Sequence, residues 1–295
     1  MNIALVTNNK LHHKYWASQL YANNTDKVKL ILIPDGEQSN FIKKTKEKKL
    51  LYYGYYYFLI KLKSILYNYF SKQSLINKIS IAEKNYFLEH KINYESIPND
   101  IIYNIKSVNC EFAINLIKKN KIDVVFFLGG DIARSSFINS VKICLNYHSG
   151  LSPFYNGNKT IFHAVSDFRP NFSGGTLMKM NERIDGGEIL MHFFPSIRDD
   201  DRAEDLFMKS IIGSIKLYQT FIDMNTYNVD GIIQKKSFKY VRNIDWNFIN
   251  DLKLISFYNH KRMQLYNRNS TVINYMNKNY SLKDLYSLCL EFVLR

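Results

Sequence analysis

The sequence predicts an α/β protein in which a mostly parallel sheet is flanked by helices. Continuous apolar runs, typical of strands that a parallel sheet buries on both faces, occur at residues 2–6, 28–33, 124–128 and 143–147. Segments with apolar residues at helical spacing separate several of these runs, and such alternation predicts an α/β architecture. We expect one main domain over residues 1–225, with a helical insert at about 40–95 and a small C-terminal region over 226–295.

The first strand, helix and second strand are expected at Asn2 to Val6, Leu11 to Ala22 and Val28 to Ile33. Two strands joined through a helix form a βαβ unit, whose crossover is right-handed. The turn after the first strand, Thr7-Asn8-Asn9, does not contain the pattern G-x-G-x-x-G. A dinucleotide site at this turn is therefore not supported.

The insert combines basic and aromatic residues. Five lysines lie between residues 43 and 49 beside the single acid Glu47, and a tyrosine-rich run follows at 50–60. We predict two helices here, near 47–71 and 74–90. One interpretation is a surface that contacts lipid headgroups, nucleic acid or a partner. The favoured alternative is an insert whose tyrosines pack on the domain while its lysines stay solvated.

The third apolar run ends in glycines. A helix is predicted over Val108 to Asn120, followed by a strand from Val124 to Leu128 and then by Gly129 and Gly130. In open α/β sheets ligands bind in the crevice at the carboxyl ends of the strands, and glycine allows the backbone to approach a ligand closely. A simple tight turn is the alternative. A short helix near 134–139 is expected next.

The fourth apolar run and the loop after it contain the residues that could take part in a chemical reaction. Asn146 and His148 lie two residues apart in the strand at 143–147 and its end, so their side chains share a face. A loop rich in Gly, Ser, Pro and Asn follows at 149–158, and Asp185 stands later between turn formers. Together these three side chains offer an oxyanion donor, a tunable acid or base, and a carboxylate that can orient it.

Further elements are predicted after this loop, namely a helix, two strands and a long helix at residues 159–167, 176–180, 188–194 and 203–224. In the region 226–295 a helix is predicted at 282–294, but no alternating series of strands is long enough for an OB barrel. We therefore expect a small α-rich appendage there.

Charge, cysteine spacing and hydrophobicity indicate which kinds of ligand and which compartment to expect. The formal charge of +14 favours anionic ligands, but abundant Lys, Asn, Ile and Tyr make this charge partly compositional, so a nucleic-acid role is not favoured. Three widely spaced cysteines form neither a disulfide framework nor a metal-binding pair, which indicates a reducing cytoplasm. The uncharged run at 50–60 is shorter than the ~20 residues of a spanning helix, and no signal peptide is recognised. No metal is expected.

The three polar residues suit acyl transfer to an amine. Such a reaction passes through a tetrahedral oxyanion, and removing one hydrogen-bond donor to it typically costs about 2.7–4 kcal/mol. The attacking amine also needs a proton acceptor and the leaving nitrogen a proton donor. No cysteine and no G-x-S-x-G elbow lies nearby, so direct transfer is favoured over a covalent acyl-enzyme.

The sequence around this site resembles the formyltransferases that use 10-formyltetrahydrofolate, a family that includes glycinamide ribonucleotide, methionyl-tRNA and sugar N-formyltransferases. The resemblance covers residues 108–195 and, more weakly, the first strand, helix and strand. The matching pieces are Asn146-x-His148, Ser-Gly-Leu-Ser-Pro-x-Tyr155-x-Gly157 and Ile184-Asp185-Gly-Gly-Glu-Ile189.

This resemblance implies a Rossmann-like domain with the folate in a pocket at the strand ends. By analogy, Asn146 and His148 would stabilise the formyl oxyanion, while Asp185 would hold His148 or a water and help to take up the proton of the amine. The implied cofactor-binding residues are Phe127, Leu128, Gly129, Gly130 and Ile184. The implied substrate-binding residues are Ser149, Gly150, Tyr155 and Lys159.

Several departures bear on the acceptor. The Tyr-Arg-Gly of the family is Tyr155-Asn156-Gly157 here, so either Lys159 substitutes for the missing arginine or the acceptor differs from tRNA. The insert and the tail favour the sugar N-formyltransferases, whose acceptor is a nucleotide-linked amino-deoxysugar. The alternatives are methionyl-tRNA formylation, hydrolysis of formyltetrahydrofolate, and a non-catalytic basic binding protein on the same fold. If the chain forms a homodimer, the apolar tail or the 50–70 helix is the expected surface.

Overall fold

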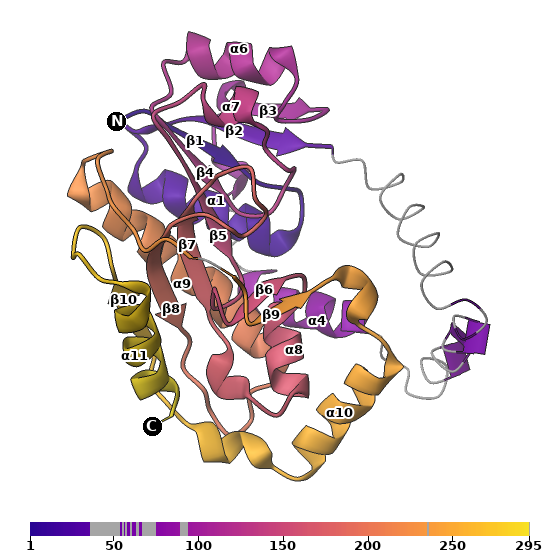
Figure 1. Cartoon of the computed structure of the whole chain (residues 1–295). Coiled ribbons are helices and arrows are strands. Elements are labelled where there is room, and N and C mark those ends of the chain that lie inside the picture. The colour runs from indigo at the N-terminus through magenta and orange to yellow at the C-terminus, as the bar shows by residue number, and fades with distance from the viewer. Residues whose placement is uncertain are drawn as a thin grey trace.

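The computed structural model describes residues 1–35, 75–88, 94–234 and 236–294, together with scattered positions between 54 and 66. An eight-stranded sheet, with the strand order β10-β8-β7-β5-β4-β1-β2-β3, lies at the centre of these ranges (Figure 1). Its strands are β1 (Ile3–Val6), β2 (Val28–Pro34), β3 (Ile102–Ile105), β4 (Val124–Phe127), β5 (Ile143–His148), β7 (Gly175–Lys179), β8 (Ile189–Phe194) and β10 (Thr271–Asn274).

Parallel pairing joins β3, β2, β1, β4 and β5. The three remaining strands, β7, β8 and β10, extend the sheet by antiparallel pairing. The predicted fold class, an α/β protein with a mostly parallel sheet flanked by helices, is confirmed. All four strands that the apolar runs predict lie in the parallel part of this sheet.

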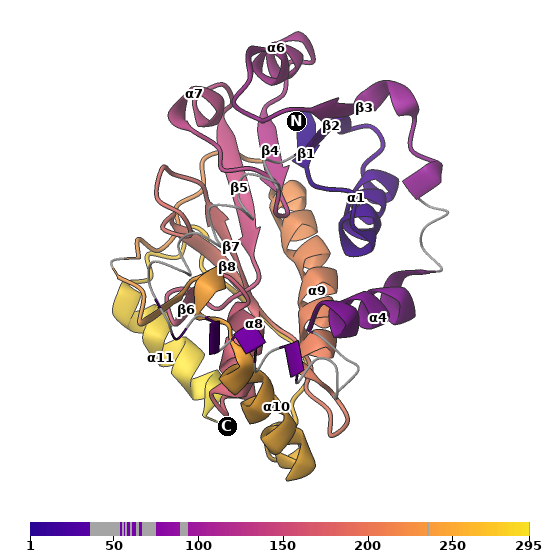
Figure 2. The ribbon, with the colours of Figure 1, turned by 90° about the vertical axis from the view of Figure 1, so that its right-hand side faces the viewer.

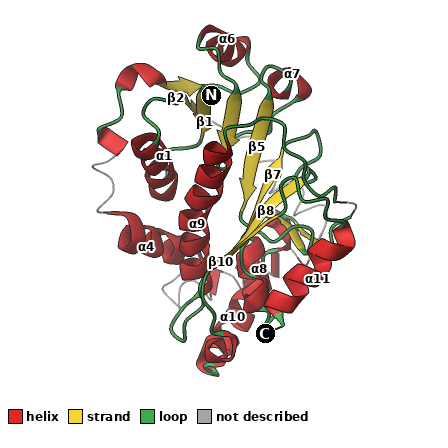
Figure 3. Cartoon of the chain, turned by 90° about the vertical axis from the view of Figure 1, so that its left-hand side faces the viewer, coloured by secondary structure: helices red, strands yellow, loops and turns green. Residues whose placement is uncertain are grey.

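Helices cover both faces of the sheet (Figures 2 and 3). Successive side chains of β1 point to opposite faces. Ile3 and Leu5 pack with Trp16 in the hydrophobic cluster on one face, and Ala4 and Val6 pack in the cluster on the other face. The first face carries α1 (Leu11–Asn23), α4 (Leu75–Phe87) and α9 (Ala203–Met224), and the second carries α6 (Glu111–Lys119) and α7 (Ser135–Ile138). Because both faces are covered, the continuous apolar runs of the central strands are explained.

The insert is described in part. Its second predicted helix, 74–90, corresponds to α4, and the His12 Nδ1 atom contacts the Glu83 carboxylate, which joins α4 to α1. The predicted helix at 47–71 and the lysine cluster at 43–49 lie outside the described residues, apart from scattered positions of that helix. Within the described ranges, no helix is long and apolar enough to cross a membrane.

The tail differs from the expected α-rich appendage, because it also supplies strands. Strand β10 forms an edge of the main sheet, and β9 (Lys239–Val241) pairs with β6 (Tyr155–Gly157) inside the predicted loop 149–158. These short strands, and β3, were not predicted as sheet strands, because their hydrogen-bond partners lie far away in the sequence. Two helices complete the tail, α10 (Phe248–Asn259) and α11 (Leu282–Val293). The domain boundary at 225 stays a prediction.

Candidate active site

A cavity of about 1040 Å³ opens at the carboxyl ends of β4 and β5. Its walls come from the segment after β4, the loop between β7 and β8, and residues 240–244 of the tail. Gly129 and Gly130 follow β4 with φ values of +65° and +94°, a backbone region that glycine enters without steric cost. The cavity lies where an open α/β sheet is expected to bind ligands, and its size is typical of a small-molecule site.

Strand β5 places Asn146 and His148 on one face. The residue between them, Tyr147, points to the opposite face, where its hydroxyl lies 2.7 Å from the Ser210 backbone oxygen of α9. Asn146 lines the cavity, and its side chain has no hydrogen-bond partner among the described residues. Its amide is thus available to donate a hydrogen bond to an oxygen bound in the cavity.

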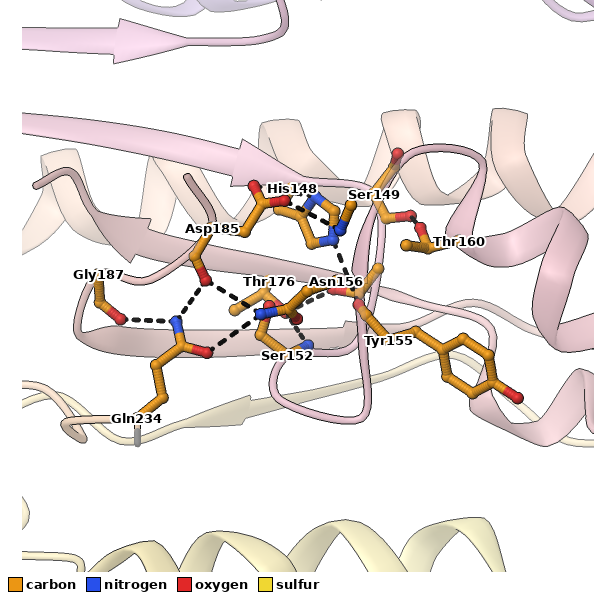
Figure 4. Close-up of polar contacts among 12 residues, drawn as sticks. His148, Ser149, Ser152, Tyr155, Asn156, Thr160, Thr176, Asp185, Gly187 and Gln234 are labelled. Atoms are coloured by element: carbon orange, nitrogen blue, oxygen red, sulfur yellow. Dashed lines mark hydrogen bonds and ion pairs between the residues drawn. The ribbon is translucent and has the colours of Figure 1, made fainter. Parts of the chain in front are cut away.

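His148 and Asp185 are in contact, as Figure 4 shows. The imidazole Nδ1 lies 3.4 Å from Asp185 Oδ1, and Nε2 lies 3.3 Å from the Tyr155 backbone oxygen. His148 is only 7% exposed and stands behind the cavity, whereas Asp185 forms part of its wall. The structure therefore brings together the three residues that the sequence predicts as catalytic; the roles assigned to them stay a prediction.

Asp185 is held through both its backbone and its side chain. Its φ of +51° is in the left-handed region, which is uncommon for a residue with a side chain. The Asp185 carboxylate accepts a hydrogen bond of 3.0 Å from the Gly157 backbone N–H. Its backbone oxygen accepts two more, from Asn156 Nδ2 at 3.1 Å and Gln234 Nε2 at 2.8 Å.

Four of the five predicted cofactor-binding residues line the cavity, namely Phe127, Gly129, Gly130 and Ile184. Leu128 does not: it is 3% exposed and packs in the core cluster on the other face of the sheet from Phe127. Successive residues of an extended segment point to opposite faces, which is why the Leu128 side chain cannot join the wall that Phe127 forms.

None of the four predicted substrate-binding residues lines the cavity. The Ser149 backbone oxygen accepts a hydrogen bond from Thr160, which ties the loop to α8 (Thr160–Ser166). A Cβ atom added at Gly150 would lie 2.5 Å from His148 Nε2. The Lys159 ammonium lies 5.7 Å from the centre of the Trp246 ring.

The Tyr155 side chain also points away from the cavity (Figure 4). Its hydroxyl donates a 2.9 Å hydrogen bond to the Asp167 carboxylate. Burial is the main factor that raises the pKa of this hydroxyl, so it remains a donor. Tyr155 thus reaches His148 through its backbone oxygen, and its role in binding substrate stays a prediction.

Two residues of the site were missed in the sequence. Asn156 was noted only as a departure from the family pattern, and Gln234 lies 49 positions after the Asp185 that it contacts. Neither position carries a local signal that could have revealed it. Among the described residues, no group of three or more His, Cys, Asp or Glu side chains is placed to hold a metal ion.

Charged residues of both signs stand at the cavity. Lys179 Nζ pairs with Glu188 at 2.7 Å, and Arg242 pairs with Asp245 at 2.8 Å. Arg183 also lines the cavity and is exposed. Asp131, Glu182 and Asp185 also line the cavity, so the formal charge of its wall is balanced, and the three cations offer local contacts for the anionic part of a ligand.

Comparison with known proteins relates this part of the chain to a family. Residues 80–211, which carry the three candidate catalytic residues, match the family model described as formyl transferase. A methionyl-tRNA formyltransferase from Wigglesworthia glossinidia brevipalpis is 31% identical over 176 residues, which are 54% of this chain and 55% of that protein. The chain thus spans about half the length of this curated relative.

Solved structures show the same fold over most of the chain. A sugar N-formyltransferase from a Shewanella species matches with a TM-score of 0.52 and 17% identity, covering 87% of this chain and 88% of that one. A 4-N formyltransferase from Francisella tularensis matches with a TM-score of 0.53 and 16% identity, covering 87% of each chain. The predicted resemblance to formyltransferases is confirmed.

Proposed function

We propose that this protein moves a formyl group from 10-formyltetrahydrofolate to the amine of a nucleotide-linked amino-deoxysugar. The match of residues 80–211 to the formyl transferase family model supports this proposal. One observation carries the proposal: His148 contacts Asp185, and Asn146 projects from the same face of β5 at the cavity. This arrangement fills the three roles that direct acyl transfer to an amine requires.

Each residue has a distinct task in this reaction. Asn146 donates a hydrogen bond to the formyl oxygen while the amine nitrogen attacks the formyl carbon and negative charge develops on that oxygen. Asp185 and His148 take up the proton that the amine loses. A carbon–nitrogen bond to the acceptor forms, the bond to the donor nitrogen breaks, and the proton returns to that leaving nitrogen.

The cavity fits the formyl donor in size and chemistry. Its volume of about 1040 Å³ accommodates a drug-sized ligand. Gly129 and Gly130 offer exposed backbone at one wall, and apolar side chains such as Ile132 and Met180 line others. A flat, partly apolar ring system with a charged tail suits such walls and the cations at the rim.

The nucleotide-linked sugar is supported by overall architecture. The similarity to the sugar N-formyltransferase fold extends over 87% of the chain. The formal charge of +14 also favours an anionic acceptor. A second candidate acceptor is methionyl-tRNA, because the 31% identical relative bears that name. A cytoplasmic location and a homodimer stay predictions.

His148→Ala tests the reaction. We expect formyl transfer to fall about 10²- to 10⁴-fold, the usual contribution of a general acid or base, while the affinity for the folate stays within about tenfold. His260→Ala serves as a matched control, because His260 is exposed and its Nδ1 contacts only the Ser256 backbone oxygen of α10. Normal turnover in a folded His148→Ala protein would reject the assignment.

A panel of acceptors tests the substrate. The protein is incubated with 10-formyltetrahydrofolate and amino sugars linked to dTDP, UDP or GDP, and in a separate reaction with aminoacylated initiator tRNA. We expect formylation of one nucleotide-linked sugar, detected by a mass increase of the acceptor. Formylation of the tRNA alone would overturn the sugar proposal, and release of formate without any acceptor would indicate a hydrolase.

A further inference from the structure

Gln234 belongs to the tail and contacts the loop between β7 and β8 that carries Asp185. It lies outside the segment 80–211 that matches the family model. The backbone groups of Ile232 and Ile189 exchange two hydrogen bonds, of 2.8 and 2.9 Å, in antiparallel orientation. Two residues further along, Gln234 stands opposite Gly187 and is only 4% exposed. The tail thereby delivers a buried amide to the loop that carries Asp185.

The hydrogen bonds fix the orientation of this amide (Figure 4). Gln234 Nε2 donates to the backbone oxygens of Asp185 and Gly187, both at 2.8 Å. Because backbone oxygens only accept, the nitrogen must face them. The Gln234 Oε1 atom then accepts from Asn156 Nδ2 at 3.4 Å, and Asn156 itself donates to the Asp185 backbone oxygen.

These contacts determine where the Asp185 carboxylate stands. Its backbone is in the left-handed region with φ +51°, and such a conformation persists only where the surrounding structure imposes it. The side-chain amides of Asn156 and Gln234 hold the Asp185 backbone oxygen. With the backbone held in this way, the Asp185 carboxylate lies 3.0 Å from the Gly157 backbone nitrogen and 3.4 Å from His148 Nδ1.

We propose that Gln234 is a positioning residue, which fixes the Asp185 loop so that the carboxylate meets His148. For its activity readout the inference rests on the proposed function. It gives the tail an indirect part in the reaction, through a residue that acts on Asp185 and does not line the cavity. The buried Gln234 amide is suited to this task, because it binds two backbone oxygens of the loop without itself lining the cavity.

Gln234→Met removes the amide and nearly preserves the side-chain volume. A displacement of about 1 Å at a catalytic group can lower the rate about 100-fold, so we expect kcat to fall about 10- to 100-fold, with KM for both substrates within about threefold. Gln264→Met is the matched control, because Gln264 is an exposed glutamine of the same tail. Equal kcat in folded Gln234→Met and wild-type protein would overturn the inference.

A double-mutant cycle separates positioning from general damage. If Gln234 acts through Asp185, then adding Gln234→Met to Asp185→Asn should lower kcat by less than about twofold further. A full additional loss in the double variant would mean that the two residues act independently, and would reject the inference. Gln234→Glu keeps the length but replaces the donor by an acceptor, so it should lose kcat as Gln234→Met does; should Gln234→Met fail to fold, Gln234→Glu decides by the same criteria.

A crystal structure of Gln234→Met tests the inference without any turnover. Asp185 Oδ1 lies 3.4 Å from His148 Nδ1 in the wild-type protein. Without the amide that holds the Asp185 backbone oxygen, the carboxylate should move away from the imidazole by about 1 Å, the size of displacement that lowers catalytic rates. An unchanged contact between His148 and Asp185 in Gln234→Met would contradict the inference. If instead the wild-type protein transfers no formyl group but the carboxylate moves in Gln234→Met as expected, the proposed function fails and the positioning role stands.

Discussion

At the residue scale, Gly150 sets the position of the His148 ring. A Cβ atom at residue 150 would lie 2.5 Å from His148 Nε2, 2.6 Å from the Tyr155 backbone oxygen and 2.7 Å from Thr160 Oγ1. The sequence predicted Gly150 as a substrate-binding residue. Its evident structural contribution is space, since only a residue without a side chain allows the imidazole and the loop to pack this closely.

Gly150→Ala should therefore disturb the site and the core together. Overpacking of this kind typically costs about 1–3 kcal/mol, and displacement of His148 should lower kcat by up to about 100-fold. A thermal melt and a turnover assay measure the two effects. At Gly54 an added Cβ meets nothing within 4 Å but φ is +49°, so Gly54→Ala should strain the local backbone and leave kcat unchanged. Wild-type kcat in Gly150→Ala would show that the ring tolerates displacement.

At the scale of elements, His192 connects β8 to the loop after β5 and to the tail. Its Nε2 lies 2.8 Å from the Ser152 backbone oxygen, and its Nδ1 lies 2.9 Å from the Tyr275 hydroxyl just after β10. The side chain is fully buried, and burial lowers the pKa of His192 to about 3. The ring is therefore neutral in the folded protein, with Nε2 as donor and Nδ1 as acceptor.

This pKa predicts a loss of stability in acid. The folded pKa of about 3 lies below the ~6.5 of an unfolded histidine. Between these values the unfolded chain binds more protons, so the free energy of unfolding falls as the pH falls from 6.5 toward 3.

His192→Gln should lessen that fall by up to about 1.4 kcal/mol per pH unit below 6.5, the effect of one proton. Urea unfolding of both proteins at pH 5, 6 and 7 measures the difference. Other buried histidines, such as His163, whose pKa burial lowers to about 4, contribute equally to both proteins. Parallel pH profiles would show that His192 is not responsible.

At the scale of the whole molecule, the tail completes the sheet and covers it. Strand β10 pairs with β8, and Phe292 of α11 lies 4.6 Å from the Phe194 ring, measured between centroids. Without the tail, apolar residues of β8 would meet water, and Asp185 would lose Gln234. Residues of 226–295 thus share a core cluster with residues of 1–225.

Residues 1–225 alone should consequently not form a stable domain. We expect this fragment to aggregate or to lack a cooperative thermal transition, because exposed apolar surface and an uncovered strand edge both promote association. Circular dichroism and sedimentation report these properties, with the full chain as reference. Addition of the 226–295 fragment should restore solubility. A monomeric 1–225 fragment with a sharp transition would support an independent domain instead.

The sequence by itself determined the α/β class and the candidate catalytic residues, because both are written in local patterns. Buried parallel strands such as β4 are apolar throughout, and the spacing of Asn146 and His148 fixes their shared face wherever the strand lies. Asp185 could be added because the family pattern includes it.

Only the tertiary structure decided the rest. Strands β6, β9 and β10 are short and form through distant partners, and the direction of the Tyr155 side chain depends on Asp167 and the neighbouring aromatic rings. Gln234 reaches Asp185 because the tail pairs with the start of β8. A contact between residues this far apart produces no periodic pattern in either segment, because it forms only when folding brings the two segments together.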